Sequence, residues 1–145
     1  MSKLDIIEVK ETTPQLVQDI NHLLAQLSER KPQIDTATLQ QIVDSPDTYL
    51  YIGRTRDRAV GMLTLASYLA PTGRKWWIED VVVDAQSRGQ GIGQALVERA
   101  VAEVGQAGGG SLLLTSRPSR QAANRLYRRM GFRQRETNLY KKVVE

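Results

Sequence analysis

The stretch VVVDAQSRGQGIGQAL, residues 81–96, decides how the rest of the chain is interpreted. Its valines predict a buried strand, residues 87–93 predict a glycine-rich turn, and the apolar spacing from Ile92 predicts a helix to about Gln106. The first backbone N–H groups of a helix lack internal partners, and the helix dipole places roughly half a positive charge there. Because glycines let phosphate oxygens approach the backbone, this segment is typical of an anion-binding site.

Two well-known phosphate-binding loops do not fit residues 87–93. The nucleotide P-loop needs Gly-Lys followed by Ser or Thr, and the chain contains no Gly-Lys pair. The dinucleotide fingerprint Gly-x-Gly-x-x-Gly fails as well, because Gln94 or Leu96 stands where its third glycine should be. A glycine-rich turn without a ligand is the alternative. The side chain of Arg88 can add a cation to an anion site or form a local salt bridge.

The composition limits the class of protein. The chain has 145 residues, no cysteine and a single histidine, His22, which excludes a disulfide framework, a cysteine nucleophile and a thiolate or histidine-rich metal site. The lack of cysteine fits a reducing cytoplasm. No apolar run approaches the roughly 20 residues that span a bilayer, and an acid, Asp5, lies close to the start. We therefore expect a cytoplasmic protein without a signal peptide or a membrane partner.

The charge is unevenly distributed. Lys and Arg number 20 against 16 Asp and Glu, and this net charge of +4 suits an anionic ligand. The excess is concentrated in seven arginines: Arg117, Arg120, Arg125, Arg128, Arg129, Arg133 and Arg135. These could contact a ligand phosphate, form a solvated helix face or bind nucleic acid. Nucleic acid has the weakest support, because the stretch holds only two aromatic residues and offers no stacking platform for bases.

The length of the chain and the lack of a linker between domains predict one domain over residues 1–145. The expected helices cover residues 14–29, 36–44, 92–106 and 119–130, and the expected strands cover 4–10, 48–54, 59–68, 76–83, 111–115 and 138–144. Alternating strands and helices in the second half indicate α/β layering, and the central hairpins indicate antiparallel pairing. We expect a mixed, mostly antiparallel sheet of six to seven strands flanked by about four helices.

Two blocks in the second half of the chain follow one another in a specific order. The first is Arg-x-x-Gly-x-Gly, formed by Arg88, Gly91 and Gly93 after an apolar strand, and the second is AANRLYRRMGF, residues 122–132. They resemble the acetyl-CoA pyrophosphate motif and the Leu-Tyr helix closing on Gly-Phe of the GNAT family of N-acetyltransferases. The resemblance covers roughly residues 76–132, and the first half of the chain matches only in element order.

The resemblance implies an α/β GNAT-type fold and an acetyl-CoA-dependent enzyme. Members pass the acetyl group directly to a primary amine, so acetyl-CoA is a co-substrate and no metal is required. The lack of cysteine is compatible with direct transfer, since no acyl-cysteine can form. The acceptor stays open: a small amine, an amino sugar, an antibiotic, a polyamine or a protein N-terminus. A homodimer is an expectation from the family, and the alternatives are a catalytically silent CoA-binding sensor and a basic nucleic-acid-binding module.

The same resemblance implies the residues that bind the cofactor. The strand residues Val81, Val82 and Val83 would offer main-chain hydrogen bonds to pantetheine, with an N–H near Val81 or Val82 beside the thioester oxygen. Asn124 falls where relatives often place a polar contact to the cofactor, and its alternative is a helix-surface asparagine. The pyrophosphate would be held by Arg88, Gly89, Gln90, Gly91, Ile92, Gly93 and Gln94.

Two residues are candidates for acid–base chemistry. Glu79 is the candidate general base, because partial desolvation in an apolar strand raises a carboxyl pKa. Asp80 would point to the opposite face of a regular strand, and the alternative for Glu79 is an edge carboxylate paired with Lys or Arg. Tyr127 is the candidate general acid for the departing thiolate, since a phenol is protonated at neutral pH. Its alternative is a core tyrosine.

Three further residues, His22, Trp76 and Trp77, have ordinary structural interpretations. His22 lies outside the apolar stripe of its predicted helix, so we expect a solvated histidine. Trp76 and Trp77 alternate along a strand, so one belongs to the core and the other could line an acceptor pocket or a dimer contact.

Overall fold

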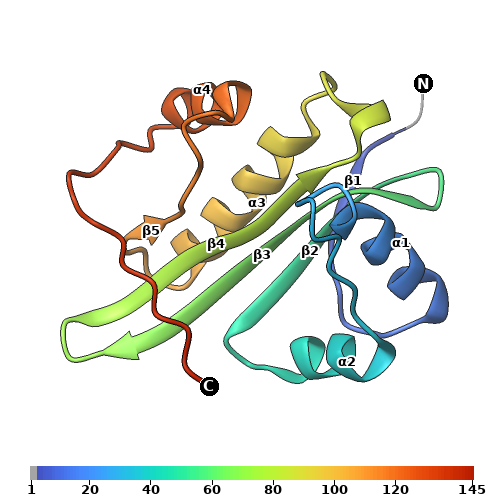
Figure 1. Cartoon of the computed structure of the whole chain (residues 1–145), viewed down its shortest axis with the longest axis horizontal. Coiled ribbons are helices and arrows are strands. Elements are labelled where there is room, and N and C mark those ends of the chain that lie inside the picture. The colour runs from blue at the N-terminus through green and yellow to red at the C-terminus, as the bar shows by residue number, and fades with distance from the viewer. Residues whose placement is uncertain (1–2) are drawn as a thin grey trace. The chain divides into compact units, whose positions relative to one another are not determined.

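The chain builds a mixed β-sheet, shown in Figure 1 for the computed structural model, which describes residues 3–145. Four strands pair antiparallel with their neighbours: β1 (Asp5–Glu8), β2 (Thr48–Thr55), β3 (Arg58–Ala70) and β4 (Gly73–Val83). A fifth, β5 (Leu112–Leu113), pairs parallel with β4. The prediction of a mixed, mostly antiparallel sheet is confirmed. The first two residues of the predicted domain 1–145 lie outside the described residues.

The helices divide between two compact units. The unit that ends at Thr115 contains the sheet with α1 (Pro14–Leu24), α2 (Thr36–Asp44), the 3₁₀ turn η1 (Ala85–Ser87) and α3 (Ile92–Gln106). The second unit, Ser116–Glu145, contains α4 (Gln121–Arg129). Four α-helices within residues 3–145 confirm the predicted number, whereas the single domain stays a prediction. None of the helices in this range is long and apolar enough to cross a membrane.

The prediction of six to seven strands is wrong, because five form within residues 3–145. Residues 132–145 contain no helix or strand, so the predicted closing strand at 138–144 is absent. Its apolar residues come in adjacent pairs separated by two lysines, so neither face of a strand would be uniformly apolar. Those residues are all exposed: Leu139, Tyr140, Val143 and Val144.

α1 begins as the sequence predicts and ends five residues earlier than expected. Thr13 is its N-cap, its side-chain oxygen accepting a hydrogen bond from the N–H of Leu16 at 3.1 Å, and Pro14 follows in the first turn. Beyond Leu24 the chain tightens into turns, in which the N–H of Gln26 donates to the carbonyl of Leu23 at 2.9 Å. This early end places the Gln26 side chain outside the helix, where it makes contacts described below.

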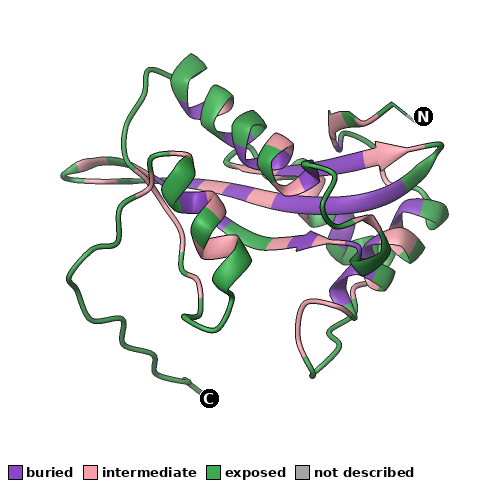
Figure 2. Ribbon diagram, turned by 90° about the horizontal axis from the view of Figure 1, so that it is seen from above, coloured by how far each residue is buried: buried purple, intermediate pink, exposed green. Residues whose placement is uncertain are grey.

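The two faces of the sheet are covered by different helices (Figure 2). On one face α1 and α2 enclose a cluster that includes Leu16, Ile20, Leu23, Leu39, Leu50, Ile52, Met62 and Val82. On the other face lies α3, whose Ile92 and Leu96 are buried against the glycines of the central strands. Burial on both faces explains why β2 and β3 carry nearly continuous runs of buried residues.

The approach of α3 to the sheet requires a glycine at position 61. A methyl group added at Gly61 would lie 2.9 Å from Cγ2 of Ile92, 3.1 Å from Cδ1 of Leu96 and 3.2 Å from the carbonyl oxygen of Val82. The last of these atoms belongs to the backbone and cannot rotate away. The first turn of α3 is therefore seated on bare main chain at the centre of the sheet.

We expect Gly61→Ala to lower the free energy of unfolding by about 1–3 kcal/mol, the usual cost of overpacking a filled core. Gly105→Ala is the matched control, because Gly105 lies in α3 with no atom within 4 Å of an added methyl group. That change should stabilise the protein by about 0.5–1 kcal/mol through helix propensity. Urea denaturation measures both, and a Gly61→Ala variant as stable as the parent would contradict this packing.

Candidate functional site

A β-bulge interrupts β4 at the two acids singled out in the sequence. Glu79 pairs with Thr64 and Val82 pairs with Met62, so two residues of β4 lie opposite Leu63 alone. Asp80 adopts the left-handed conformation with φ +52°. The extra residue changes the phase of the strand, and Val82 faces the α1 side although regular alternation from Ile78 would place it on the other. The phase of the alternation changes beyond Asp80, so the opposite orientation expected for Glu79 and Asp80 stays a prediction.

Beyond the start of the bulge, β4 has a strand on one side only. β5 pairs with it at Trp76 and Trp77, opposite Leu112 and Leu113, and no strand among the described residues pairs with the same edge from Ile78 onward. Main-chain N–H and C=O groups on such an edge can pair with an extended ligand. Trp76 is the core member of its pair, 2% exposed, whereas Trp77 is half-buried.

The turn that follows β4 begins with a buried aspartate. The N–H of Asp84 donates to the carbonyl of Val60 at 2.8 Å, which continues the sheet, and the Oδ1 of Asp84 accepts from the N–H of Gln86 at 3.3 Å. Asp84 thus caps η1, and the N–H of Ser87 closes that turn on the Asp84 carbonyl at 2.8 Å. Asp84 is not among the residues predicted from the sequence, although an Asp two residues before a turn N–H is a recognisable cap.

The N-terminus of α3 carries no side-chain cap. Its N-cap is Gly91, with φ +77°, and the preceding Gly89 also lies in the left-handed region, with φ +80°. The first two helices are capped by Thr13 and Asp35. The first N–H with a helical acceptor is that of Ala95, which donates to Gly91 at 3.0 Å, and the N–H groups of residues 88–94 have no acceptor within residues 3–145.

The surface over this uncapped helix end is open. A methyl group built on Gly89 or Gly91 would meet no atom within 4 Å. Arg88 is exposed and forms no ion pair with the carboxylates of residues 3–145, so the local salt bridge considered above is not made. The Gln94 side chain donates to Glu98 at 2.9 Å, and the main-chain N–H of Gln94 has no acceptor within residues 3–145. Unpaired donors, the helix dipole and an arginine together favour an anion.

The carboxyl of Glu79 has the character expected of a base. Partial burial raises the pKa of Glu79 above its ordinary value of 4.5, and the negative charge of the adjacent Asp80 raises it further. Glu79 forms no ion pair with a Lys or Arg among the described residues, so the paired edge carboxylate is not observed. Because Glu79 is an exposed residue, it can exchange a proton with solvent or with a bound ligand.

The second unit carries the other predicted residues. In α4, Tyr127 is buried, and burial raises its pKa above 10.0 although the charge of Arg120 lowers it, so the phenol is protonated at neutral pH. Its ring lies edge-on to that of Phe132, 5.9 Å between centroids. Asn124 donates to the carbonyl of Arg117 at 3.0 Å and so fixes the segment that leads into α4.

A glycine ends α4 as the sequence predicts. Gly131 has φ +93°, its N–H donates to Arg128 at 3.1 Å, and the N–H of Phe132 donates to Tyr127 at 3.0 Å. These two bonds define a Schellman motif. The roles of Tyr127 and Asn124 toward a cofactor stay predictions, as does any contact between the arginines and a phosphate.

His22 does not lie free in solvent. Its side chain is 55% exposed, as expected, but its Nε2 lies 3.7 Å from the Oδ2 of Asp84. No group of three or more His, Asp or Glu residues within residues 3–145 is arranged to hold a metal ion.

Comparison with known proteins identifies the family. The model of the acetyltransferase (GNAT) family matches residues 16–132, so the chain belongs to that family. No curated protein sequence gives a significant match.

Solved structures share the fold. A transcriptional regulator from Bacillus halodurans C-125 is 25% identical, with a TM-score of 0.83, and the match covers 97% of this chain and 100% of that one. An acetyltransferase from Trypanosoma brucei is 22% identical, with a TM-score of 0.79 and coverage of 97% and 100%. An aminoglycoside N-acetyltransferase, AAC(6')-Iy, solved in complex with CoA, is 15% identical, with a TM-score of 0.81 and coverage of 99% and 96%.

We expect Asp80→Asn to lower the pKa of Glu79, because it removes the adjacent negative charge while keeping a residue that tolerates the left-handed conformation. The pKa should stay above its ordinary value, since burial is the larger cause. Carboxyl NMR titration measures the shift. Asp47→Asn is the control, because the exposed Asp47 pairs with Arg74 and is not among the causes of the raised pKa of Glu79. An unmoved Glu79 titration in Asp80→Asn would show that the two carboxylates do not interact.

Proposed function

We propose that this protein is an acetyl-CoA-dependent N-acetyltransferase that passes the acetyl group directly to a primary amine. The observation that carries the proposal is the uncapped N-terminus of α3, open to solvent and preceded by two left-handed glycines. When bound, acetyl-CoA supplies an acetyl thioester, and transfer of its acetyl group to the amine releases the free thiol of CoA.

The residues present fit a diphosphate. The N–H groups of residues 89–94 supply donors without competing acceptors, and the exposed Arg88 supplies a cation that no carboxylate of the described residues pairs with. The side chain of Ile92 is 2% exposed and holds the helix end against the sheet, so the donors are fixed before a ligand arrives. The AAC(6')-Iy structure, which holds CoA on a similar fold, is consistent with this assignment.

The open edge of β4 fits the extended, amide-containing arm of CoA. Val81 and Val83 lie where the edge has no strand beside it, and main-chain groups there would pair with the pantetheine amides. The bulge at Asp80 turns the main chain at this point, and an N–H near Val81 or Val82 would stabilise negative charge on the thioester oxygen. The side chain of Val82 is buried and anchors the strand.

Two side chains would move protons. Glu79 would take a proton from the ammonium group of the acceptor, directly or through water, and its raised pKa brings it closer to the range of an effective base. Tyr127, protonated at neutral pH, would give a proton to the departing thiolate. An aminoglycoside acetyltransferase of this fold, from an uncultured soil sample and 19% identical, was solved with sisomicin, which supports an amine as the acceptor.

The direct test is calorimetric titration with CoA together with detection of released thiol over a panel of amines. We expect binding below about 1 mM and thiol release that depends on both substrates. Failure to bind at that concentration would refute the assignment. Binding without thiol release for any amine would instead favour a CoA-binding sensor.

A pair of variants at Gly91 isolates the role of charge at the helix end. Both Asp and Asn tolerate the left-handed conformation, but only Gly91→Asp places a carboxylate where the diphosphate would lie. We expect Gly91→Asp to bind CoA at least about tenfold more weakly than Gly91→Asn, with a larger difference at low salt. Equal affinities for the two variants would place the diphosphate elsewhere.

Tyr127→Phe tests the proposed acid. The change keeps the ring packed against Phe132 and removes the hydroxyl, so turnover should fall by about 100-fold while CoA affinity is unchanged. Tyr140→Phe is the control, since Tyr140 is 86% exposed in the segment without secondary structure. Steady-state kinetics measure both, and an undiminished rate in Tyr127→Phe would remove this residue from the mechanism.

A further inference from the structure

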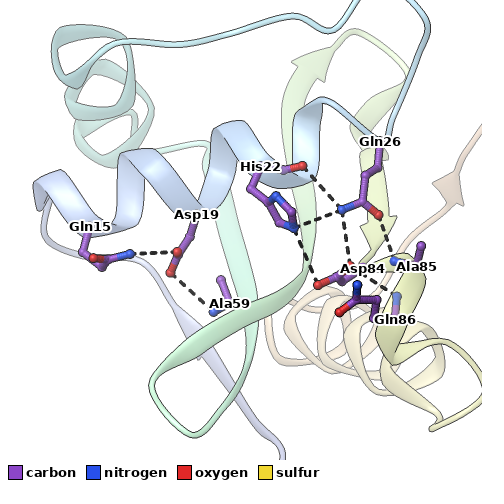
Figure 3. Close-up of polar contacts among 8 residues, drawn as sticks. All are labelled: Gln15, Asp19, His22, Gln26, Ala59, Asp84, Ala85 and Gln86. Carbon is purple, nitrogen blue, oxygen red and sulfur yellow. Dashed lines mark hydrogen bonds and ion pairs between the residues drawn. The ribbon is translucent and has the colours of Figure 1, made fainter.

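A small polar cluster connects the end of α1 to the start of the turn after β4 (Figure 3). The Gln26 side chain contacts two consecutive residues there. Its Oε1 accepts a hydrogen bond from the N–H of Ala85 at 2.8 Å, and its Nε2 donates to the Oδ1 of Asp84 at 3.3 Å. His22 completes the cluster, with its Nε2 3.3 Å from the Nε2 of Gln26 and 3.7 Å from the Oδ2 of Asp84.

The turn has few other main-chain attachments. Ser87 is bonded to Asp84, and Ala95 is bonded to Gly91 at the first turn of α3. Between them, the N–H groups of residues 88–94 have no acceptor within residues 3–145. The position of these donors is therefore set by the two ends of the segment. The packing of Ile92 fixes the helix end, and Asp84 with Ala85 fixes the strand end.

The bond from Ala85 to Gln26 lies at the surface. Ala85 is exposed, so without Gln26 water can accept from its N–H and no buried donor is stranded. The buried Asp84 would keep its bonds to Gln86 and Val60. Loss of the Gln26 side chain should therefore leave the turn free to change its orientation. The free energy of unfolding should change little.

We propose that Gln26 is a positioning residue for the cofactor: it holds Ala85 and Asp84 so that the unpaired N–H groups of residues 89–94 converge on one diphosphate. This inference rests on the proposed function. It assigns to the turn that follows α1, through a residue 58 positions from Asp84 in sequence, a share in cofactor affinity that the motif at residues 88–93 does not contain.

The test compares Gln26→Leu with Gln15→Leu. Gln15 lies in the first turn of α1, and its side chain donates one exposed hydrogen bond, to Asp19, so Gln15→Leu removes the same side-chain amide without affecting the turn after β4. We expect Gln26→Leu to bind CoA about 5- to 10-fold more weakly, the effect of one or two hydrogen bonds, with turnover at saturating acetyl-CoA unchanged. Gln15→Leu should match the parent in both quantities.

Two further measurements separate positioning from a general loss of structure. With S-acetylpantetheine, a donor without the diphosphate, Gln26→Leu should be as active as the parent, whereas a damaged fold would lower activity with both donors. Hydrogen exchange of the unliganded proteins should be faster over residues 85–87, whose N–H groups are hydrogen-bonded, in Gln26→Leu only.

The outcomes distinguish the inference from the proposed function. CoA affinity in Gln26→Leu equal to that of the parent would overturn the inference while the function stands. If the parent itself fails to bind CoA, the proposed function fails, and hydrogen exchange then decides whether Gln26 holds the turn. Equal exchange over residues 85–87 in all three proteins would show that Gln26 does not hold the turn.

Discussion

The close contact between α3 and the bare main chain at Gly61 is the constraint on which the candidate site depends. Ile92 and Leu96 reach the sheet only because no side chain stands between them and the strand. This contact sets the helix N-terminus beside the end of β4, so the unpaired N–H donors and the open strand edge belong to one region of the first unit. A wider separation would leave the same glycines in the turn but no fixed direction for their N–H groups.

The second constraint is that the two ends of β4 differ in how they are paired. The strand is paired on both sides at Trp76 and Trp77, and it contributes Trp76 and Ile78 to the core. Its second half contains the bulge, carries Glu79 and Asp80, and has a strand on one side only. One strand thus supplies both core residues and a main-chain edge without a neighbouring strand. The change from pairing on two sides to pairing on one occurs within a few residues of the candidate base, Glu79.

Much of this arrangement could be predicted from the sequence, because the signals are local. Helical spacing gave the bounds of α2 and α3 to the residue, and Gly131 marked the end of α4. The open helix end followed from the glycines at 89, 91 and 93. Features that depend on distant partners were not visible. The bulge at Asp80 arises from the register with β3, and Gln26 shows its role only when Ala85 is brought beside it.

The missing strands have a different origin. Residues 138–144 have the composition of a strand but not its alternation, so local propensity overstated their order. The two tryptophans show the reverse case: strand alternation predicted that one belongs to the core, and only the packing against Tyr49, 6.3 Å away, and the near-complete burial of Trp76 select it.

The brevity of β5 has a thermodynamic consequence. A ladder of two register positions has few main-chain bonds, so we expect the border of the sheet next to the candidate cofactor site to open more readily than the long ladders of β2, β3 and β4. A ligand lying along residues 79–83 would act as a substitute strand and close that gap with its own amides. Melting temperature should then rise with ligand concentration, and the saturated protein would behave as a sheet one strand wider than the empty one.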